Sequence, residues 1–476
     1  MKHAKLSTLV KRLPAEIQKK FDTMSFEAVD EAAHRFVHSV GLRFKAGDWL
    51  NELMPPRELL EGDVTKFEFF EHVHSTSHFV PFVEKALVPQ GSRLCIIGDV
   101  HGDIAYLIDV LGELQRQGVL DEEYRLIDPT VHIVFLGDYT NRNAHGVEVM
   151  LVLFYLYRHN MGRVFLLRGN HEYAISTRVM YDQYQQFYSE NNREVVHKHD
   201  VPSKDSLIAE MSHKFSLYNF PNLLYWFDFL PLAAYIGCYD EQARQIDYIS
   251  LCHGGIEPGY NATHFLSSQA RFERLVQLDR SKALRELISN NNIPNATQTF
   301  EVLFKRLQDI GMHAFVDSYI EDKAVDLMKN HSPLKLRIGM QFNSFLTDNN
   351  DAIACASSQR HRNLLFGREL TRYFLEQGDT AGHRVISIIR GHQHLDEHDP
   401  VVGLDSPMLT QLRQRQGIVR QWDGMLYTMG DGGSATGWQA FLIVTTGKSL
   451  QEWTATHYFR ADTELPFETK ETLFIG

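Results

Sequence analysis

The sequence has little cysteine, no long apolar run and a deficit of positive charge. Its 476 residues include four cysteines, Cys95, Cys238, Cys252 and Cys355, with no CxxC pair among them. This spacing excludes a disulfide framework and is typical of a protein in a reducing compartment. No stretch of about 18 uncharged apolar residues occurs, and the first residues contain no apolar segment long enough for a signal peptide. We therefore expect a soluble, cytoplasmic protein with no transmembrane segment.

Acidic residues outnumber basic ones, 60 to 48, which gives a formal net charge of −12. Such a charge argues against sequence-blind nucleic-acid binding, which needs a basic face, so no nucleic-acid partner is expected. An anionic substrate is compatible with it, because a few local arginines are enough to bind a phosphate. The composition, 43% hydrophobic and 23% charged, is typical of a globular protein with one large or two moderate domains.

The hydrophobic pattern divides the chain into regions. Residues 1–90 are predicted to be helical, because apolar side chains recur every three or four residues, and residues 264–334 are charged, amphipathic and helix-like. We interpret the second of these regions as a helical insertion, either a cover for the outer core or a docking surface for a partner. Residues 91–263 and 335–460 form the predicted catalytic domain, and residues 461–476 a C-terminal tail.

Within the predicted catalytic domain, strands alternate with helices. Apolar runs at 94–97, 131–136 and 164–167 are separated by helical patterns at 104–117 and 147–157. Further strand-like runs follow at 385–389, 424–429 and 440–444. This alternation indicates βαβ units, and hence an α/β fold whose functional loops follow the carboxyl ends of strands.

Five short motifs rich in metal-binding side chains each follow an apolar run. They are Gly98-Asp99-Val100-His101-Gly102, Gly137-Asp138-Tyr139, Gly169-Asn170-His171-Glu172, His253-Gly254-Gly255 and Gly391-His392-Gln393-His394. Any one of them alone is compatible with an ordinary turn whose polar groups are satisfied. Five in order, each after an apolar run, indicate a single site.

These donors suit two metal ions. Asp99 and His101 are two residues apart and can reach one ion, while the two carboxylate oxygens of Asp138 can bridge a pair. A neutral oxygen and two imidazoles complete the set, from Asn170, His253 and His392. Such a mixture favours borderline cations over Ca²⁺, with Mn²⁺ expected and Fe or Zn²⁺ as alternatives. Two ions about 3.5–4 Å apart can hold a hydroxide for in-line attack on a phosphoryl group.

Phosphoryl transfer also needs groups that meet the phosphate charge and the leaving group. Arginine suits the phosphate oxygens, because its planar fork matches their geometry. His171 stands beside Asn170, where it can give a proton to the leaving alkoxide.

At these motifs the sequence resembles the phosphoprotein phosphatase (PPP) family of calcineurin-like metallophosphoesterases. Phe165–Glu172 contains that family's LLRGNHE motif in full. Phe229–Ala234 and Cys252–Ile256 resemble its LPIAA and CHGGL motifs, and Ile389–Gln393 resembles its RAHQ motif. The segment 360–367 aligns with the family's NDRGVSFTFG segment.

The resemblance covers about 92–262 and 335–445, and it implies a fold and a set of roles. The implied fold is α/β, a sandwich of two mixed β-sheets flanked by helices, here with added helical regions. The implied ligands of the first metal are Asp99, His101 and Asp138, and those of the second are Asp138, Asn170, His253 and His392. The implied phosphate-binding residues are Arg142 and Arg360, and the implied general acid is His171.

Three features depart from the family pattern. Asn141 stands where the family has the aspartate that partners the catalytic histidine, so we expect a lower pKa for His171 and weaker catalysis with poor leaving groups. The loop Met429–Ser434 lacks the family's overhanging tyrosine, which predicts a more open site that can admit phosphotyrosine. His394 follows Gln393 and is either an additional first-metal ligand or a loop cap.

The predicted function is therefore that of a dinuclear-metal-dependent phosphoprotein phosphatase. It would hydrolyse phosphomonoesters on Ser/Thr, with Tyr as a further candidate, through direct attack of a metal-bridging hydroxide. The alternatives are a small-molecule phosphoesterase, acting on a dinucleoside polyphosphate or another nucleotide, and a catalytically inactive binding scaffold. The intact ligand set argues against the scaffold, and the extra helical regions argue against the compact small-molecule enzymes.

The tail carries Glu464, Glu468 and Glu471 ahead of Leu473-Phe474-Ile475. It resembles the glutamate-containing C-terminal signals of bacterial type IV secreted effectors, a group that includes PPP-like phosphatases. The resemblance implies secretion as an effector that acts in a host cell, with a merely solvated tail as the alternative.

Overall fold

The computed structural model describes residues 6–41, 43, 81–172, 207–215, 224–275, 305, 339–347, 355–357, 364–377, 382–399 and 404–475. Arg360 lies outside these residues, as does most of the predicted insertion 264–334. The chain divides into two compact units. Unit 1 consists of residues 1–79, 99–133 and 137–230, and unit 2 of residues 80–98, 134–136 and 231–476.

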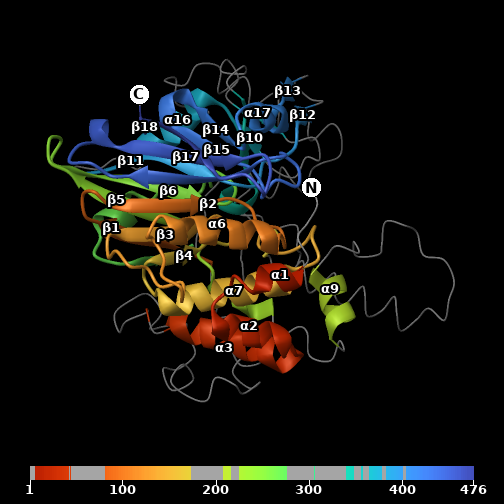
Figure 1. Cartoon of the computed structure of the whole chain (residues 1–476). Helices are drawn as coiled ribbons and strands as arrows, with labels where there is room; N and C mark the ends of the chain where they lie inside the picture. The colour runs from red at the N-terminus through yellow and green to blue at the C-terminus, as the bar shows by residue number, and fades with distance from the viewer. Residues whose placement is uncertain are drawn as a thin grey trace. The chain divides into compact units, whose positions relative to one another are not determined.

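Unit 1 is mainly helical and is built around α7 (Gly146–His159). Every residue of α7 from Gly146 to Tyr157 is buried, as expected for a helix that is hydrophobic all round. It contacts α2 (Ala15–Asp22), α3 (Phe26–Gly41), α6 (Ile104–Arg116) and α9 (Leu207–Lys214) (Figure 1). The other described elements of this unit are α1 (Leu6–Val10), β4 (Val164–Leu166) and η2 (Leu224–Phe229).

Aromatic side chains attach the N-terminal helices to α7. Phe36 of α3 stacks on Phe154 of α7 with ring centroids 4.8 Å apart. Trp226 of η2 meets Phe154 edge-on at 4.9 Å and Phe36 at 6.1 Å. Such ring pairs contribute about 0.5–1.5 kcal/mol each beyond the area that they bury. The helical structure predicted for this part of residues 1–90 is thus confirmed in α3, and its apolar face packs on α7.

Unit 2 contains a seven-stranded mixed sheet in the order β14-β15-β11-β6-β5-β1-β7. In that order the strands are Ile418–Gln421, Leu426–Met429, His383–Arg390, Gln245–Cys252, Ala233–Asp240, Phe82–Val88 and Phe272–Arg274. Strands β6 and β11 are parallel neighbours. Their carboxyl ends therefore meet at one edge of the sheet, where the loops with His253 and His392 begin.

A second group of strands in unit 2 has the order β18-β17-β16-β2, with antiparallel pairing throughout. These strands are Glu468–Leu473, Thr454–Arg460, Gln439–Thr445 and Arg93–Ile97. In the sheet, β3 (Val131–Phe135) is the next strand after β2. Just after the end of β3, the Leu136 N–H donates to the Ile97 carbonyl. On its other side, the start of β3 has β4 as its neighbour within unit 1. There the Ile133 N–H donates to the Arg163 carbonyl.

Short elements complete the described part of unit 2. The helices are α11 (Thr263–Ser267), α15 (Gly339–Phe342), α16 (Arg368–Gln377), α17 (Met408–Gln414), η5 (Trp422–Gly424) and η6 (Leu450–Glu452). The strands are β8 (Ser344–Phe345), β9 (Cys355–Ser357), β10 (Leu364–Phe366), β12 (Glu397–Asp399) and β13 (Leu404–Ser406).

The predicted α/β fold with two mixed sheets is confirmed, and the predicted strands that precede the first three motifs correspond to β2, β3 and β4. The sequence predicts helical structure up to residue 90, but this is wrong for Phe82–Val88, which forms β1. Six of its residues pair in parallel with β5. A sheet partner that is distant in the sequence decides this conformation, and the local pattern of the segment does not reveal it.

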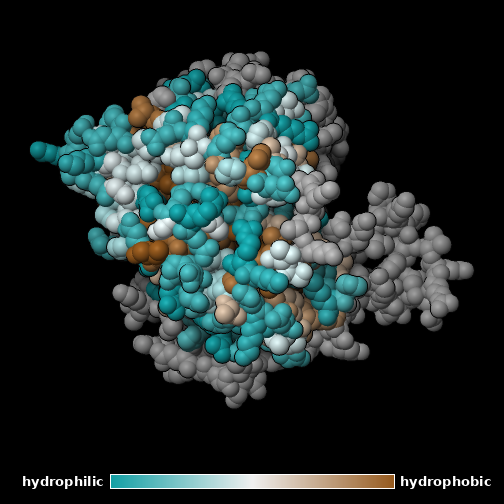
Figure 2. All heavy atoms as spheres, in the orientation of Figure 1, coloured by the Kyte–Doolittle hydropathy of each residue, from teal (hydrophilic) through white to brown (hydrophobic). Residues whose placement is uncertain are grey.

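On the face shown in Figure 2, hydrophilic side chains predominate among the described residues and hydrophobic ones are scattered between them. The exposed large hydrophobic residues include Leu87, Ile127 and Leu473, which are far apart in the sequence. None of the described helices is long and apolar enough to cross a membrane.

The burial of Phe474 gives a test of the packing in unit 2. Its side chain is 0% exposed and its ring stacks on Tyr427 at 5.2 Å, whereas the preceding Leu473 is 55% exposed. We expect Phe474→Ala to lower the free energy of unfolding by about 3 kcal/mol, because it leaves a cavity. The neighbouring control, Leu473→Ala, should change it by less than about 0.5 kcal/mol. Urea unfolding of both variants measures this, and equal effects would contradict the packing described.

Candidate metal centre

The loops that follow β2 and β3 are joined by backbone hydrogen bonds within unit 1. The carbonyl of Asp138 accepts from the N–H groups of Val100 at 3.1 Å and His101 at 2.7 Å. The carbonyl of Tyr139 accepts from the Gly102 N–H at 2.8 Å. Three of the predicted ligands lie on these two loops, and the bonds fix their backbones relative to one another.

Carboxylates and imidazoles converge between these loops. Asp99 and Asp138 are 0% exposed, and His101 is 1% exposed. The Nε2 atom of His101 lies 3.5 Å from an Asp138 carboxylate oxygen and 3.8 Å from one of Asp99. One ligand atom from each of His101, Asp138 and His171 lies within 4.8 Å of the others. Two buried carboxylates this close need a compensating positive charge, so the donors fit a divalent cation.

The ring of His101 is oriented by a neighbouring carbonyl. Its Nδ1 atom lies 3.2 Å from the carbonyl oxygen of Thr140. A hydrogen bond of this kind is the usual support of a metal-binding imidazole, because it leaves the other nitrogen free of its proton. Here that other nitrogen is Nε2, the atom that faces Asp99 and Asp138.

Glu172 connects the loop after β3 with the loop after β4. Its carboxylate is 0% exposed and accepts from the N–H groups of Asp138 at 2.7 Å, Tyr139 at 2.9 Å and Gly169 at 3.1 Å. In the sequence Glu172 belongs to a motif, but no role can be predicted for it, because a glutamate that positions a loop and a glutamate on the surface are the same letter. The position of Glu172, directly after the predicted site residues Asn170 and His171, is the feature of the sequence that could have indicated this role.

Two glycines allow the same loops to approach each other. Gly137 has φ +109°, and a Cβ atom there would meet the backbone of Gly169. A Cβ atom on Gly169 would in turn meet the backbone and carboxylate of Asp138. Only glycine fits either position, since any side chain would force the Asp138 and Asn170 loops apart.

The structure places His171 between Asp138 and Asn141. The backbone N–H of His171 donates to the Asp138 carboxylate at 2.9 Å. The ring Nε2 of His171 lies 3.8 Å from the other oxygen of that carboxylate. Its Nδ1 lies 2.8 Å from the amide nitrogen of Asn141. Asn170 is half-buried beside it, and Arg142 is exposed with a left-handed φ of 72°.

In unit 2, His253 and His392 lie side by side. His253 is 0% exposed, its Nδ1 lies 3.2 Å from the Leu136 carbonyl, and its Nε2 lies 3.2 Å from Nδ1 of His392. The two ring centroids are 5.0 Å apart. Because Leu136 stands two positions before Asp138 in the chain, His253 is tied to the strand that leads into the Asp138 loop.

Arg390 and Gln393 hold the backbone around His392. Arg390 is 0% exposed and donates to the Gly254 carbonyl at 2.5 Å and to the Gln393 side-chain oxygen at 3.0 Å. That oxygen also accepts the Phe345 N–H at 3.1 Å. The adjacent His394 is 2% exposed. The loops after β6 and β11 are therefore fixed to each other by a buried network within unit 2.

The sequence profile described as "Calcineurin-like phosphoesterase" matches residues 92–396, which is more than half of the chain. The chain belongs to the calcineurin-like phosphoesterase family.

Similar proteins with curated names include two phosphatases. The chain is 27% identical over 196 residues to the serine/threonine-protein phosphatase 2B catalytic subunit A1 of Saccharomyces cerevisiae, over 40% of this chain and 27% of that one. It is 33% identical over 118 residues to the serine/threonine-protein phosphatase 6 catalytic subunit of Caenorhabditis elegans, over 24% of this chain and 31% of that one. The chain thus spans less than a third of the length of these relatives.

Among solved structures, the chain is similar to a protein serine/threonine phosphatase from Saccharomyces cerevisiae that has similarity to the human phosphatase PP5. The sequence identity is 17% and the TM-score is 0.41, with 81% of this chain and 82% of that chain covered.

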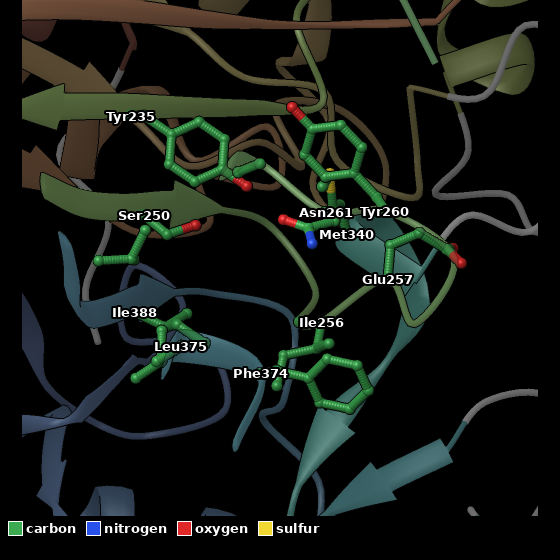
Figure 3. Close-up of a pocket in the computed structure, with 13 residues that line it drawn as sticks. Tyr235, Ser250, Ile256, Glu257, Tyr260, Asn261, Met340, Phe374, Leu375 and Ile388 are labelled. Carbon is green, nitrogen blue, oxygen red and sulfur yellow. The ribbon is translucent and has the colours of Figure 1, made fainter. Parts of the chain in front are cut away.

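A cavity of about 60 Å³ lies within unit 2, beside the loop that follows His253. The residues that line it include Tyr235 of β5, Ser250 of β6, Phe374 of α16 and, from the loop after His253, Tyr260 (Figure 3). Such a volume holds a few water molecules but no phosphorylated side chain. We assign the cavity no part in substrate binding.

Glu172→Gln tests the support of the metal-binding loops. The amide of glutamine offers one acceptor where the carboxylate offers two, so part of the bonding to Asp138, Tyr139 and Gly169 is lost. We expect metal affinity to fall by about 10- to 100-fold, as for other residues that support metal ligands. Calorimetric titration with Mn²⁺ measures this, with Glu122→Gln, an exposed glutamate of unit 1, as the control. Wild-type affinity in the Glu172 variant would show that the loops hold their geometry without it.

Proposed function

We propose that the protein is a dinuclear-metal-dependent phosphatase that acts on phosphoprotein, on Ser/Thr and also on Tyr. The observation that carries this proposal is the buried convergence of Asp99, His101 and Asp138 beside His171, in a chain of the calcineurin-like phosphoesterase family. The names of the curated relatives support a phosphoprotein substrate.

The proposed metal ligands are the residues that the resemblance to the PPP family implies. They are Asp99, His101, Asp138, Asn170, His253, His392 and, as an additional donor, His394. Mn²⁺ suits this set of oxygen and imidazole donors, with Fe or Zn²⁺ as alternatives. When bound, the ions would supply the positive charge that draws electrons from phosphorus and activates water for in-line attack.

Arg142 is the proposed phosphate-binding residue on unit 1, together with Arg360, which lies outside the described residues. The Arg142 side chain is exposed, so a substrate can reach it. Its backbone follows Asn141 directly, and both residues have left-handed φ angles of 72° and 67°. A loop held in this sparsely populated conformation presents the guanidinium from a fixed backbone, which suits two-point recognition of a phosphate.

Two further proposals concern the context of the enzyme. A partner-docking role for residues 264–334 is supported only by their charged, amphipathic sequence. Delivery into a host cell is supported only by the resemblance of the C-terminal residues to effector signals. Part of those residues, Glu468–Leu473, forms strand β18 and pairs with β17, and Phe474 is buried. A secretion machinery would therefore meet the last residues as folded structure unless β18 detached.

Phosphate release from phosphopeptides tests the proposed function. We expect Mn²⁺-dependent release that a chelator abolishes and that Asp138→Asn reduces by at least about 100-fold, because one bridging carboxylate loses its charge. Matched phosphoserine, phosphothreonine and phosphotyrosine peptides are the substrates. Release from nucleotides alone would replace the proposal with a small-molecule phosphoesterase, and no release at all would favour an inactive scaffold.

Arg142→Lys tests the proposed phosphate contact. Lysine keeps the charge but loses the planar fork, so we expect kcat/KM for a phosphopeptide to fall by about 10-fold or more, mainly through KM. Arg116→Lys is the matched control, because Arg116 is an exposed arginine on α6 of the same unit. If both variants keep wild-type kinetics, Arg142 does not bind the phosphate.

A further inference from the structure

A short loop, residues 141–145, carries Arg142 and leads into the start of α7. Asn141 and Arg142 have left-handed φ angles of 67° and 72°. This conformation costs free energy for any residue other than glycine, so it persists only where neighbouring groups hold it. Helix α9 provides such groups, and it does so at both ends of the loop.

The first contact of α9 is at the beginning of the loop. The backbone N–H of Leu207, the first residue of α9, donates to the side-chain Oδ1 of Asn141 at 2.6 Å. Leu207 is buried, which keeps this donor in place. The bond therefore holds the residue that directly precedes Arg142.

The second contact is at the end of the loop, where α7 begins and α9 packs against it (Figure 1). Glu210 of α9 is buried, and its carboxylate accepts from the N–H groups of Gly146 at 2.8 Å and Val147 at 3.0 Å. The first N–H groups of a helix have no partner within the helix and favour a negative charge. His145, the N-cap residue of α7, makes no side-chain cap bond. Glu210 thus caps α7 from a second helix.

Lys214 of α9 joins the same three parts of unit 1. Its Nζ atom donates to the carboxylates of Glu210 at 2.7 Å and Glu148 at 2.5 Å, which links α9 to α7. It also donates to the carbonyl of Ala144 at 3.4 Å, which lies on the loop itself, two positions after Arg142. Leu207, Glu210 and Lys214 together form what we call the α9 clip.

We propose that Glu210 is a positioning residue for substrate binding, which acts through Arg142 by holding the loop of residues 141–145 in place. The proposal rests on the function proposed above, in which Arg142 binds the phosphate. A guanidinium makes two parallel hydrogen bonds to a phosphate only when its plane is correctly oriented. A loop that is held at both ends restricts the guanidinium before the substrate arrives, so binding loses less conformational entropy.

Glu210→Gln tests the α9 clip. The amide keeps the shape of the side chain, but it offers one acceptor oxygen in place of two and forms no ion pair with Lys214. We expect KM for a phosphopeptide to rise by about 5- to 10-fold and kcat to change by less than about twofold. Mn²⁺ affinity should stay at the wild-type value, because none of the bonds described for the clip involves a proposed metal ligand. Glu122→Gln, at an exposed position of unit 1, is the control and should leave both constants unchanged.

A double-mutant cycle with Arg142→Lys distinguishes positioning from a general structural role. If Glu210 acts through Arg142, then Glu210→Gln should change kcat/KM by less than about twofold once Arg142 is already lysine. Effects that simply multiply would overturn the proposal, and so would a wild-type KM in the single Glu210 variant. Thermal unfolding shows whether that variant is folded. If it is not, Lys214→Gln, which keeps the cap on α7, takes its place in the same cycle.

Binding of inorganic phosphate separates this proposal from the function on which it rests. Calorimetric titration of the Mn²⁺-loaded protein with phosphate needs no turnover. We expect Glu210→Gln to weaken phosphate binding by about 5-fold or more. If no phosphoester is hydrolysed but this loss is found, the proposed function fails and the α9 clip stands. Equal phosphate affinity in the wild type and the variant would overturn the clip, whatever the activity.

Discussion

The structure of unit 1 depends on one buried carboxylate. Glu172 accepts backbone N–H groups from Asp138, Tyr139 and Gly169, and so joins the loops after β3 and β4. A buried carboxylate is costly unless it is fully hydrogen-bonded, and here backbone donors satisfy it. The arrangement also explains why Gly137 and Gly169 have no side chain, since the two loops touch where a Cβ atom would lie.

Several of the proposed functional residues have backbone conformations that cost free energy. His101, Asp138, Asn141 and Arg142 all have positive φ angles, between 47° and 72°. Each such residue costs on the order of 1–3 kcal/mol and persists only where the surroundings hold it. Three acceptors supply that restraint through hydrogen bonds from the backbone. They are the carboxylate of Glu172, the carbonyl of Asp138 and the carboxylate of Glu210, which accepts an N–H group at the start of α7. These bonds hold the loops after β2 and β3 in the conformation that brings Asp99, His101 and Asp138 together.

Much of this architecture could be predicted from the sequence, and the remainder has physical reasons. The helix–strand alternation predicts β2, α6, β3, α7 and β4, because each has a strong local pattern. Strand β1 was missed, because pairing with the distant β5 decides its conformation. The motifs indicate the donor residues, but not Glu172, whose role depends on a close approach of two loops. The hydrogen bond from Leu207 to Asn141 was equally beyond prediction, since 66 positions separate the two residues.

The central claim is that Asp138 and the other proposed donors bind a pair of metal ions. Anomalous-scattering crystallography of the protein grown with Mn²⁺ tests it most directly. We predict two manganese peaks about 3.5–4 Å apart, both in contact with the Asp138 carboxylate. Asp99 and His101 should bind one ion, and Asn170, His253 and His392 the other. A single peak, or two peaks that Asp138 does not bridge, would contradict the dinuclear centre.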